Sequence, residues 1–111
     1  MSKIPLVHIV VLNWNRTDDT IGCIKSVSRL RTVGYELKIL IVDNGSEKNS
    51  LKALRKFVGS SKIKNIFLIE NKENLGFAEG NNVGIRYALK FGSDFVMVLN
   101  NDTLVDRSLV I

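Results

Sequence analysis

The sequence predicts an α/β domain in three layers, with a parallel sheet between helices, and three observations carry this prediction. Four apolar, β-branched runs are nearly continuous rather than alternating, which is typical of strands buried on both faces of a parallel sheet. Segments of helical periodicity separate the runs. The composition suits one soluble domain, since the chain has 111 residues, of which 45% are hydrophobic and 24% charged.

The four strands are expected at residues 7–12, 37–42, 63–69 and 95–99. The helical connections between them are long enough to make neighbouring strands parallel. We expect a Rossmann-like sheet with the strand order 3-2-1-4. The fourth strand is then an edge strand with little cover, through which a homodimer can form.

Three helices are expected between these strands. Residues 17–30 carry an apolar stripe at helical spacing, and Asp18 and Asp19 in the first turn favour the helix dipole. Residues 50–58 and 79–91 carry similar stripes. The last segment, residues 103–111, begins another apolar element.

Composition and charge exclude several classes of protein. A single Cys excludes a disulfide scaffold, and one Pro with eight Gly excludes a collagen-like chain. No apolar run approaches the roughly 20 residues of a membrane helix, and residues 1–5 lack the layout of a signal peptide, so we expect a cytoplasmic domain. The net charge of +5 favours anionic partners, including nucleotides, nucleic acids and acidic lipid surfaces, without choosing among them.

Each expected strand is followed by a polar cluster. The clusters are Asn13-Trp14-Asn15, Asp43-Asn44-Gly45-Ser46, Glu70-Asn71 and Asn100-Asn101-Asp102. Because the carboxyl ends of parallel strands meet at one edge, and ligands bind there at the switch in strand order, we expect one site across the first and fourth strands. Ordinary polar loops are the alternative interpretation.

Several residues of these clusters have two interpretations each. Asp43 can accept hydrogen bonds from a base imide or a ribose hydroxyl, or from the amides of its own loop. Trp14 can stack on a base or pack against the domain. Asp102, with Asn100 and Asn101, offers oxygen ligands that suit Mg²⁺ or Mn²⁺, or it caps a turn. The residues alone leave these alternatives open.

Gly76, Gly80 and Gly84 recur every four residues. If this segment is helical, they share one face and let the backbone approach a neighbour closely. That neighbour is either the sheet or a pyrophosphate at the helix N-terminus. His8 lies inside an apolar run and is expected in the core, and nothing near Cys23 forms a nucleophilic dyad.

Four stretches of the chain carry motifs in a recognisable order: VVLNWN at 10–15, IVDNGS at 41–46, ENLGFAEGNNVGI at 73–85 and VLNNDT at 98–103. Together they resemble the family-two glycosyltransferases of GT-A fold, in particular the rhamnosyltransferase-like branch. The resemblance implies a nucleotide-diphospho-sugar donor, Mg²⁺ or Mn²⁺, and inverting transfer to a hydroxyl of a glycan or lipid-linked acceptor. We expect no nucleic-acid partner.

The resemblance also assigns roles to residues. It implies that Trp14 stacks on the base and that Asp43 reads the base. Asn100-Asn101-Asp102 matches the family's DXD motif, whose last Asp holds the metal that bridges the diphosphate. The other residues expected around the donor are Asn13, Asn15, Asn44, Asn74, Gly76 and Asn81.

The sequence departs from the family's pattern in two places. Asn100 replaces the first carboxylate of the motif, which leaves Asp102 alone at the metal. The family's catalytic base lies beyond this motif, so we expect it beyond residue 111. We therefore expect residues 1–111 to be a truncated donor-binding domain without the acceptor half. A stand-alone module that binds a nucleotide or nucleotide sugar without catalysis is the alternative.

Three other interpretations concern charge and fold. The segment 48–64 holds six basic residues and no acidic one. It is either a solvated face or a contact with an anionic membrane surface, which would place the chain at the inner face of the membrane. A dinucleotide-binding domain would need GxGxxG after the first strand, and a receiver-like signalling domain an acidic pair there, where Asn13-Trp14-Asn15 stands instead.

Overall fold

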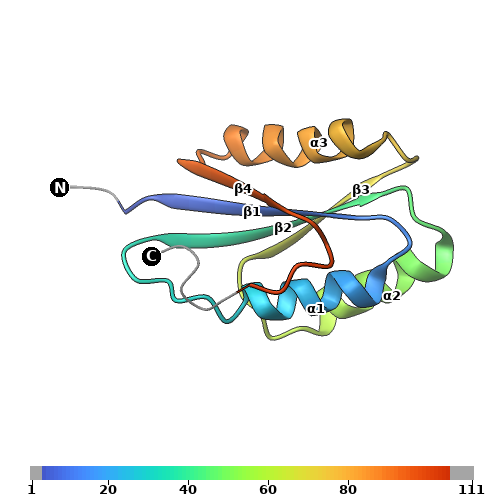
Figure 1. Cartoon of the computed structure of the whole chain (residues 1–111), viewed down its shortest axis with the longest axis horizontal. Coiled ribbons are helices and arrows are strands. Elements are labelled where there is room, and N and C mark those ends of the chain that lie inside the picture. Colours follow the sequence, from blue (N-terminus) through green and yellow to red (C-terminus); the bar gives the residue numbers. More distant parts are fainter. Residues whose placement is uncertain (1–3, 106–111) are drawn as a thin grey trace.

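Strands and helices alternate along residues 4–105, which are the residues that the computed structural model describes (Figure 1). In chain order the elements are β1 (Leu6–Asn13), α1 (Thr17–Val27), β2 (Glu36–Asn44), α2 (Lys48–Ser60), β3 (Ile66–Asn71), α3 (Phe77–Lys90) and β4 (Phe95–Leu99). This is the predicted order of elements. Most of the apolar segment expected at 103–111 lies outside the described residues.

The four strands form one sheet in the order β3-β2-β1-β4, and every pairing is parallel, as the sequence predicted. The register places Asn13 beside Asp43, and Asp43 beside Glu70. Three of the polar clusters that follow the strands therefore begin at the same level of the sheet.

Helices cover both faces of the sheet, which gives the expected three layers (Figure 1). Helices α1 and α2 cover one face, where Ile9, Ile24 and Leu54 are fully buried together. Helix α3 covers the other, over Val10 and Leu40. Alternate residues of β1 thus enter two separate cores, and this explains why its apolar run is continuous.

The small residues of α3 face the sheet. A Cβ atom added to Gly84 would lie 2.5 Å from Val10 Cγ1, and one added to Gly80 would lie 2.8 Å from Asn44 Nδ2. Of the two expected neighbours, the sheet and a pyrophosphate, the structure therefore shows the sheet for Gly80 and Gly84. Gly76 differs, because it stands at the N-cap of α3 with a φ of 85° and nothing would meet its Cβ.

Element boundaries differ from the prediction where long-range contacts decide them. Helix α2 begins at Lys48, before the predicted residue 50. Asn15 Oδ1 accepts the backbone N–H of Glu47 at 2.7 Å and so holds the residue that precedes the helix from another loop. Strand β3 begins at Ile66 rather than at 63. Asn65 just before it has a φ of 59°, a left-handed conformation that breaks the extended run.

Strand β4 is an edge within the described part of the chain, where it pairs only with β1. Its Phe95 and Val98 side chains are 62% and 40% exposed, in line with the expected poor cover. Dimerisation through this edge stays a prediction. No helix among residues 4–105 combines the length and the hydropathy needed to cross a membrane.

Candidate functional site

A chain of side-chain hydrogen bonds joins the carboxyl ends of β1 and β2 to the segment after β4. Asn13 Nδ2 donates to Asp43 Oδ1 at 3.0 Å, and Asn13 Oδ1 accepts the Thr20 hydroxyl at 2.6 Å. Thr20 Oγ1 in turn accepts from Asn101 Nδ2 at 3.2 Å. The polar clusters therefore converge at one edge, as predicted from the order of strands. Thr20 was not predicted as a site residue. Its position on the buried face of α1 is the feature that could have indicated its role.

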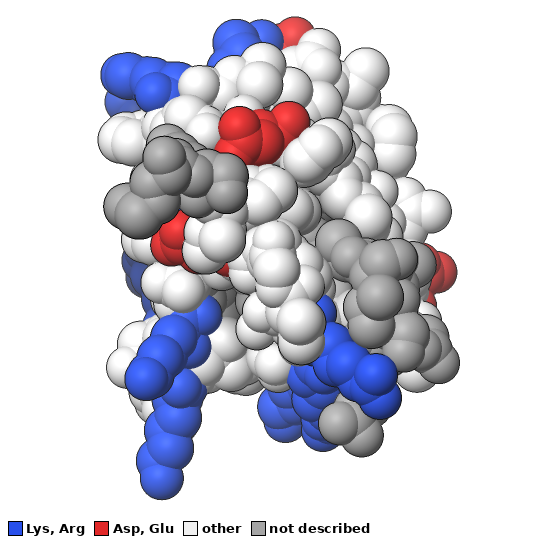
Figure 2. Space-filling view, turned by 90° about the vertical axis from the view of Figure 1, so that its left-hand side faces the viewer, with Lys and Arg blue, Asp and Glu red and all other residues white. Residues whose placement is uncertain are grey.

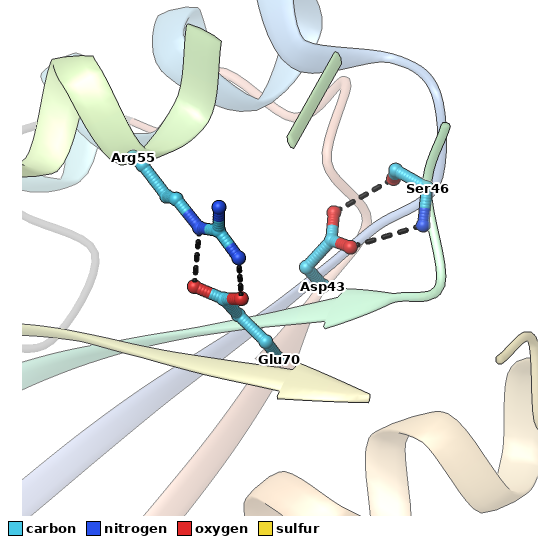
Figure 3. Close-up of polar contacts among 4 residues, drawn as sticks. All are labelled: Asp43, Ser46, Arg55 and Glu70. Carbon is cyan, nitrogen blue, oxygen red and sulfur yellow. Dashed lines mark hydrogen bonds and ion pairs between the residues drawn. The ribbon is translucent and has the colours of Figure 1, made fainter. Parts of the chain in front are cut away.

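Asp43 is fully buried and bonded by its own loop. Its Oδ1 accepts the Ser46 hydroxyl at 2.7 Å, and its Oδ2 accepts the Ser46 backbone N–H at 3.0 Å (Figure 3). This is the loop-bonded alternative that the sequence left open. Asp43 shapes the turn after β2, and a contact between Asp43 and a base stays a prediction.

Asn44 holds the loop between β3 and α3. Its Oδ1 accepts from Asn71 Nδ2 at 3.2 Å and from the Leu75 backbone N–H at 3.1 Å. Its Nδ2 donates to Asn74 Oδ1 and to the Gly76 carbonyl oxygen, each at 3.1 Å. Asn44 is 2% exposed, so its bonding capacity is spent on the loop. Asn44 and Asn74 therefore position the start of α3.

Asn15 also supports a loop. It has a φ of 54°, and its backbone N–H donates to the Ser46 hydroxyl oxygen at 2.9 Å. Together with the bond from its side chain to the Glu47 amide, this fixes the turn after β1 against the start of α2. The turn carries Trp14 and Arg16 on either side of Asn15.

The open part of the site is a cleft of about 310 Å³ at the carboxyl ends of β1 and β4. Trp14 and Phe77, with exposed fractions of 50% and 66%, offer it aromatic surface. The cleft is lined by Leu12, Trp14, Arg16, Phe77, Leu99, Asn100, Asn101 and Asp102. Its place across the first and fourth strands is the predicted one. Arg16 and Phe77 were not predicted, although each directly follows a predicted site residue, Asn15 or Gly76.

The end of β4 offers oxygen ligands for a cation. Asp102 and Asn100 are exposed in the cleft, and carboxylate and amide oxygens suit Mg²⁺ and Mn²⁺. No group of three or more His, Cys, Asp or Glu side chains within residues 4–105 is placed to hold a metal. The donor set therefore fits a cation that takes its other ligands from phosphate oxygens and water.

Cys23 is buried next to Asn100 of this cleft, and its thiol is not a suitable ligand for a cation. Burial, with a smaller effect from the Asp102 charge, raises the pKa of the Cys23 thiol to about 11. The thiol therefore stays protonated at neutral pH.

Asn81 is buried in α3 at 6% exposure, and its Oδ1 has no hydrogen-bond partner within the described structure. A buried amide oxygen of this kind calls for a water molecule or a ligand atom. Its predicted contact with a donor stays a prediction.

The basic segment 48–64 lies outside this cleft. Arg55 of α2 forms an ion pair with Glu70 at the end of β3, and its hydrogen bonds lower the pKa of Glu70 (Figure 3). Lys62 and Lys64 line a separate cleft of about 480 Å³ near the start of β2. Figure 2 faces the end of the molecule where the strands begin, and it shows Lys and Arg both in its lower half, on the side of α1 and α2, and at its top. The charge of this segment does not serve the candidate cleft.

In a comparison with known sequences, one family model matches most of the chain. The sequence model described as glycosyl transferase family 2 matches residues 8–110. An uncharacterised protein of Methanocaldococcus jannaschii is 26% identical over 94 residues, which cover 84% of this chain and 38% of that protein. The chain thus spans well under half the length of this curated relative.

Comparison with solved structures agrees on the fold. The mannosyltransferase PcManGT from Pyrobaculum calidifontis, solved with GDP-Man and Mn²⁺, superposes with a TM-score of 0.77 at 20% identity, over 96% of this chain and 30% of that one. S. aureus TarS 1-349 in complex with UDP-GlcNAc gives a TM-score of 0.74 at 18% identity, over 91% and 28%. The four-stranded arrangement of this chain therefore recurs within larger glycosyltransferase structures.

Proposed function

The chain belongs to glycosyl transferase family 2, and from that membership we propose that its cleft binds the nucleotide diphosphate of a sugar donor. The observation that carries the proposal is that Trp14 and Asp102 line the same cleft, although 88 positions separate them in sequence. An aromatic face suits a base, and a carboxylate with neighbouring amide oxygens suits a cation shared with phosphates.

The roles of individual residues follow from their positions. Half-exposed Trp14 stacks on the base, and Phe77 at the start of α3 adds a second aromatic side chain to the cleft lining. Asp102, with the amide oxygens of Asn100 and Asn101, would hold Mg²⁺ or Mn²⁺. When bound there, the cation would neutralise negative charge on the departing nucleotide diphosphate. The bonds from Asn13 and Thr20 to the neighbouring clusters keep this edge rigid before the donor arrives.

We further propose that the sugar passes to an acceptor hydroxyl with inversion, the acceptor being a glycan or a lipid-linked glycan. Inverting transfer needs a general base to take the proton of that hydroxyl. Among the described residues of the cleft, Asp102 is the sole carboxylate, and it is assigned to the cation. The base and the acceptor site are therefore proposed on residues other than those described.

A donor-binding module without transfer is the second candidate function. The single carboxylate of the described cleft favours it, since nothing else there can serve as a base. The two candidates differ in one readout. Release of free nucleotide diphosphate from a bound nucleotide sugar, in the presence of an acceptor, supports transfer, whereas binding without turnover supports the module.

Donor binding is tested by fluorescence, because Trp14 is the single tryptophan of the sequence. The protein is titrated with UDP, GDP and dTDP in MgCl₂ or MnCl₂. We expect at least one nucleotide to change the Trp14 emission saturably, and the corresponding base alone to do so more weakly. A folded protein whose emission none of the three changes would refute the proposal.

A further inference from the structure

Arg16 is the basic residue among the described residues that line the candidate cleft, and its side chain has no strong ion-pair partner. It is the N-cap residue of α1, and its side chain lines the cleft together with Trp14 and Asp102. Its side chain is 75% exposed, and its ion pair with Asp19 has a nitrogen–oxygen distance of 3.9 Å. Such an exposed, long ion pair contributes little to stability. The guanidinium is therefore available to a ligand.

Hydrogen bonds fix the backbone around Arg16, whereas its side chain is largely exposed. The Arg16 carbonyl oxygen accepts the Thr20 N–H at 3.0 Å, the first turn of α1. On its other side, Asn15 is fixed by its left-handed conformation and by its bonds to Ser46 and Glu47. The turn thus presents Trp14 and Arg16 to one cleft from two positions apart, which limits the entropy lost when a ligand is bound.

The charge of the cleft matches a diphosphate only when Arg16 takes part. Asp102 and a divalent cation together leave one positive charge, whereas the two phosphates of a nucleotide sugar carry two negative charges. Asn100 adds no charge, and Arg16 is the remaining charged residue of the lining. A guanidinium can bind phosphate oxygens in a bidentate manner, which a single ammonium cannot.

We propose that Arg16 binds the diphosphate of the donor and supplies the second positive charge of the cleft. This inference rests on the proposed function, and it adds a binding residue to that site. We expect Arg16 to favour a free nucleoside diphosphate over the matching monophosphate. At neutral pH the free diphosphate carries about one negative charge more than the monophosphate, so it needs more compensating charge.

The test compares binding by the variants Arg16→Gln, Arg16→Lys and Arg29→Gln. Arg29 is exposed just beyond the other end of α1, so its replacement removes the same charge away from the cleft. Each protein is titrated with the best nucleoside diphosphate of the wild-type panel and with the matching monophosphate, by calorimetry and Trp14 fluorescence, with Mg²⁺ or Mn²⁺. Thermal unfolding checks that each variant is folded.

We expect Arg16→Gln to weaken diphosphate binding about tenfold or more, because a charge-assisted hydrogen bond to phosphate is lost. The monophosphate should be affected less, Arg16→Lys should lie between, and Arg29→Gln should match the wild type. If Arg16→Gln binds the diphosphate as Arg29→Gln does, the inference is wrong while the proposed function stands. If the wild type binds no nucleotide of the panel, both are wrong.

Discussion

Asn13 Nδ2 lies 3.0 Å from Asp43 Oδ1, across two parallel strands whose register sets the two residues side by side. Both side chains are fully buried, and both belong to the polar clusters at the carboxyl ends of the strands. A buried carboxylate is stabilised only when hydrogen bonds replace its water, and here Asn13 and Ser46 provide them. The edge that carries the candidate cleft is therefore built on an internal polar network.

Asn13→Ala is predicted to destabilise the fold by about 1–3 kcal/mol, because it removes the two buried hydrogen bonds that the Asn13 side chain forms with Asp43 and Thr20. The free energy of unfolding in urea measures this. Asn82→Ala is the control, since Asn82 is exposed on α3. Equal stability of the two variants would show that the network is not important for the fold.

Gly84→Ala is predicted to destabilise the fold by about 1–3 kcal/mol through overpacking, since its Cβ would lie 2.5 Å from Val10 Cγ1. Gly22→Ala is the matched control within α1, where nothing lies within 4 Å of the added Cβ. That variant should gain up to about 1 kcal/mol from helix propensity. A stabilised Gly84→Ala variant would contradict the close packing of α3 on the sheet.

The stability of the protein is predicted to fall as the pH drops below about 6.5, because of His8. Burial, and secondly the charge of Lys38, lowers the pKa of His8 from its ordinary value of 6.5, while Glu36 acts in the other direction. Between the lowered pKa and pH 6.5, His8 is protonated in the unfolded chain but not in the folded chain. This contribution to the free energy of unfolding is therefore fully present above pH 6.5 and is lost as the pH falls toward the lowered pKa.

NMR of the imidazole measures this directly, since His8 is the single histidine of the sequence. We expect its signal to titrate below pH 6.5 in the folded protein, and the free energy of unfolding to be smaller at pH 5.5 than at pH 7.5. A His8 signal that titrates at or above 6.5 would contradict the predicted direction.

Trp14→Ala is predicted to weaken nucleotide binding by about 1–3 kcal/mol, the contribution of one stacked base, whereas Trp14→Phe should retain most of the affinity. Calorimetry measures both, because these variants lack the fluorescent side chain. Phe95→Ala removes an exposed aromatic at the start of β4, away from the cleft, and should bind as the wild type does. Unchanged binding by Trp14→Ala would place the base elsewhere.

The sequence predicts the sheet well because apolar runs and helical periods reflect burial that the topology then requires. The four runs give β1 to β4, and the strand order brings the polar clusters to one edge. The convergence of Trp14 with Asp102 follows from that order and needs no knowledge of side-chain contacts.

The roles of the polar residues could not be predicted in the same way. The contacts of Asp43 and Asn44 with a donor stay predictions. In the structure, the hydrogen bonds of these two side chains go to Asn13, to their own loop and to the loop before α3. The partners of Asn44 lie 27 to 32 positions away in the sequence, and Asn13, which donates to Asp43, lies 30 positions away. Sequence spacing does not contain that information. Arg16 was missed for the same reason, since only the turn at Asn15 directs it to the cleft.

The central claim is that Asp102 and a divalent cation together hold a nucleotide diphosphate beside Trp14. Calorimetry of UDP, GDP and dTDP with Mn²⁺ or Mg²⁺, on the wild type and on Asp102→Asn, tests it most directly. Glu36→Gln, which removes a carboxylate from the opposite end of the sheet, is the control. We predict binding to the wild type and to Glu36→Gln that EDTA abolishes, and binding at least about tenfold weaker to Asp102→Asn. Binding that is unchanged by EDTA and by the loss of the Asp102 charge would contradict the claim.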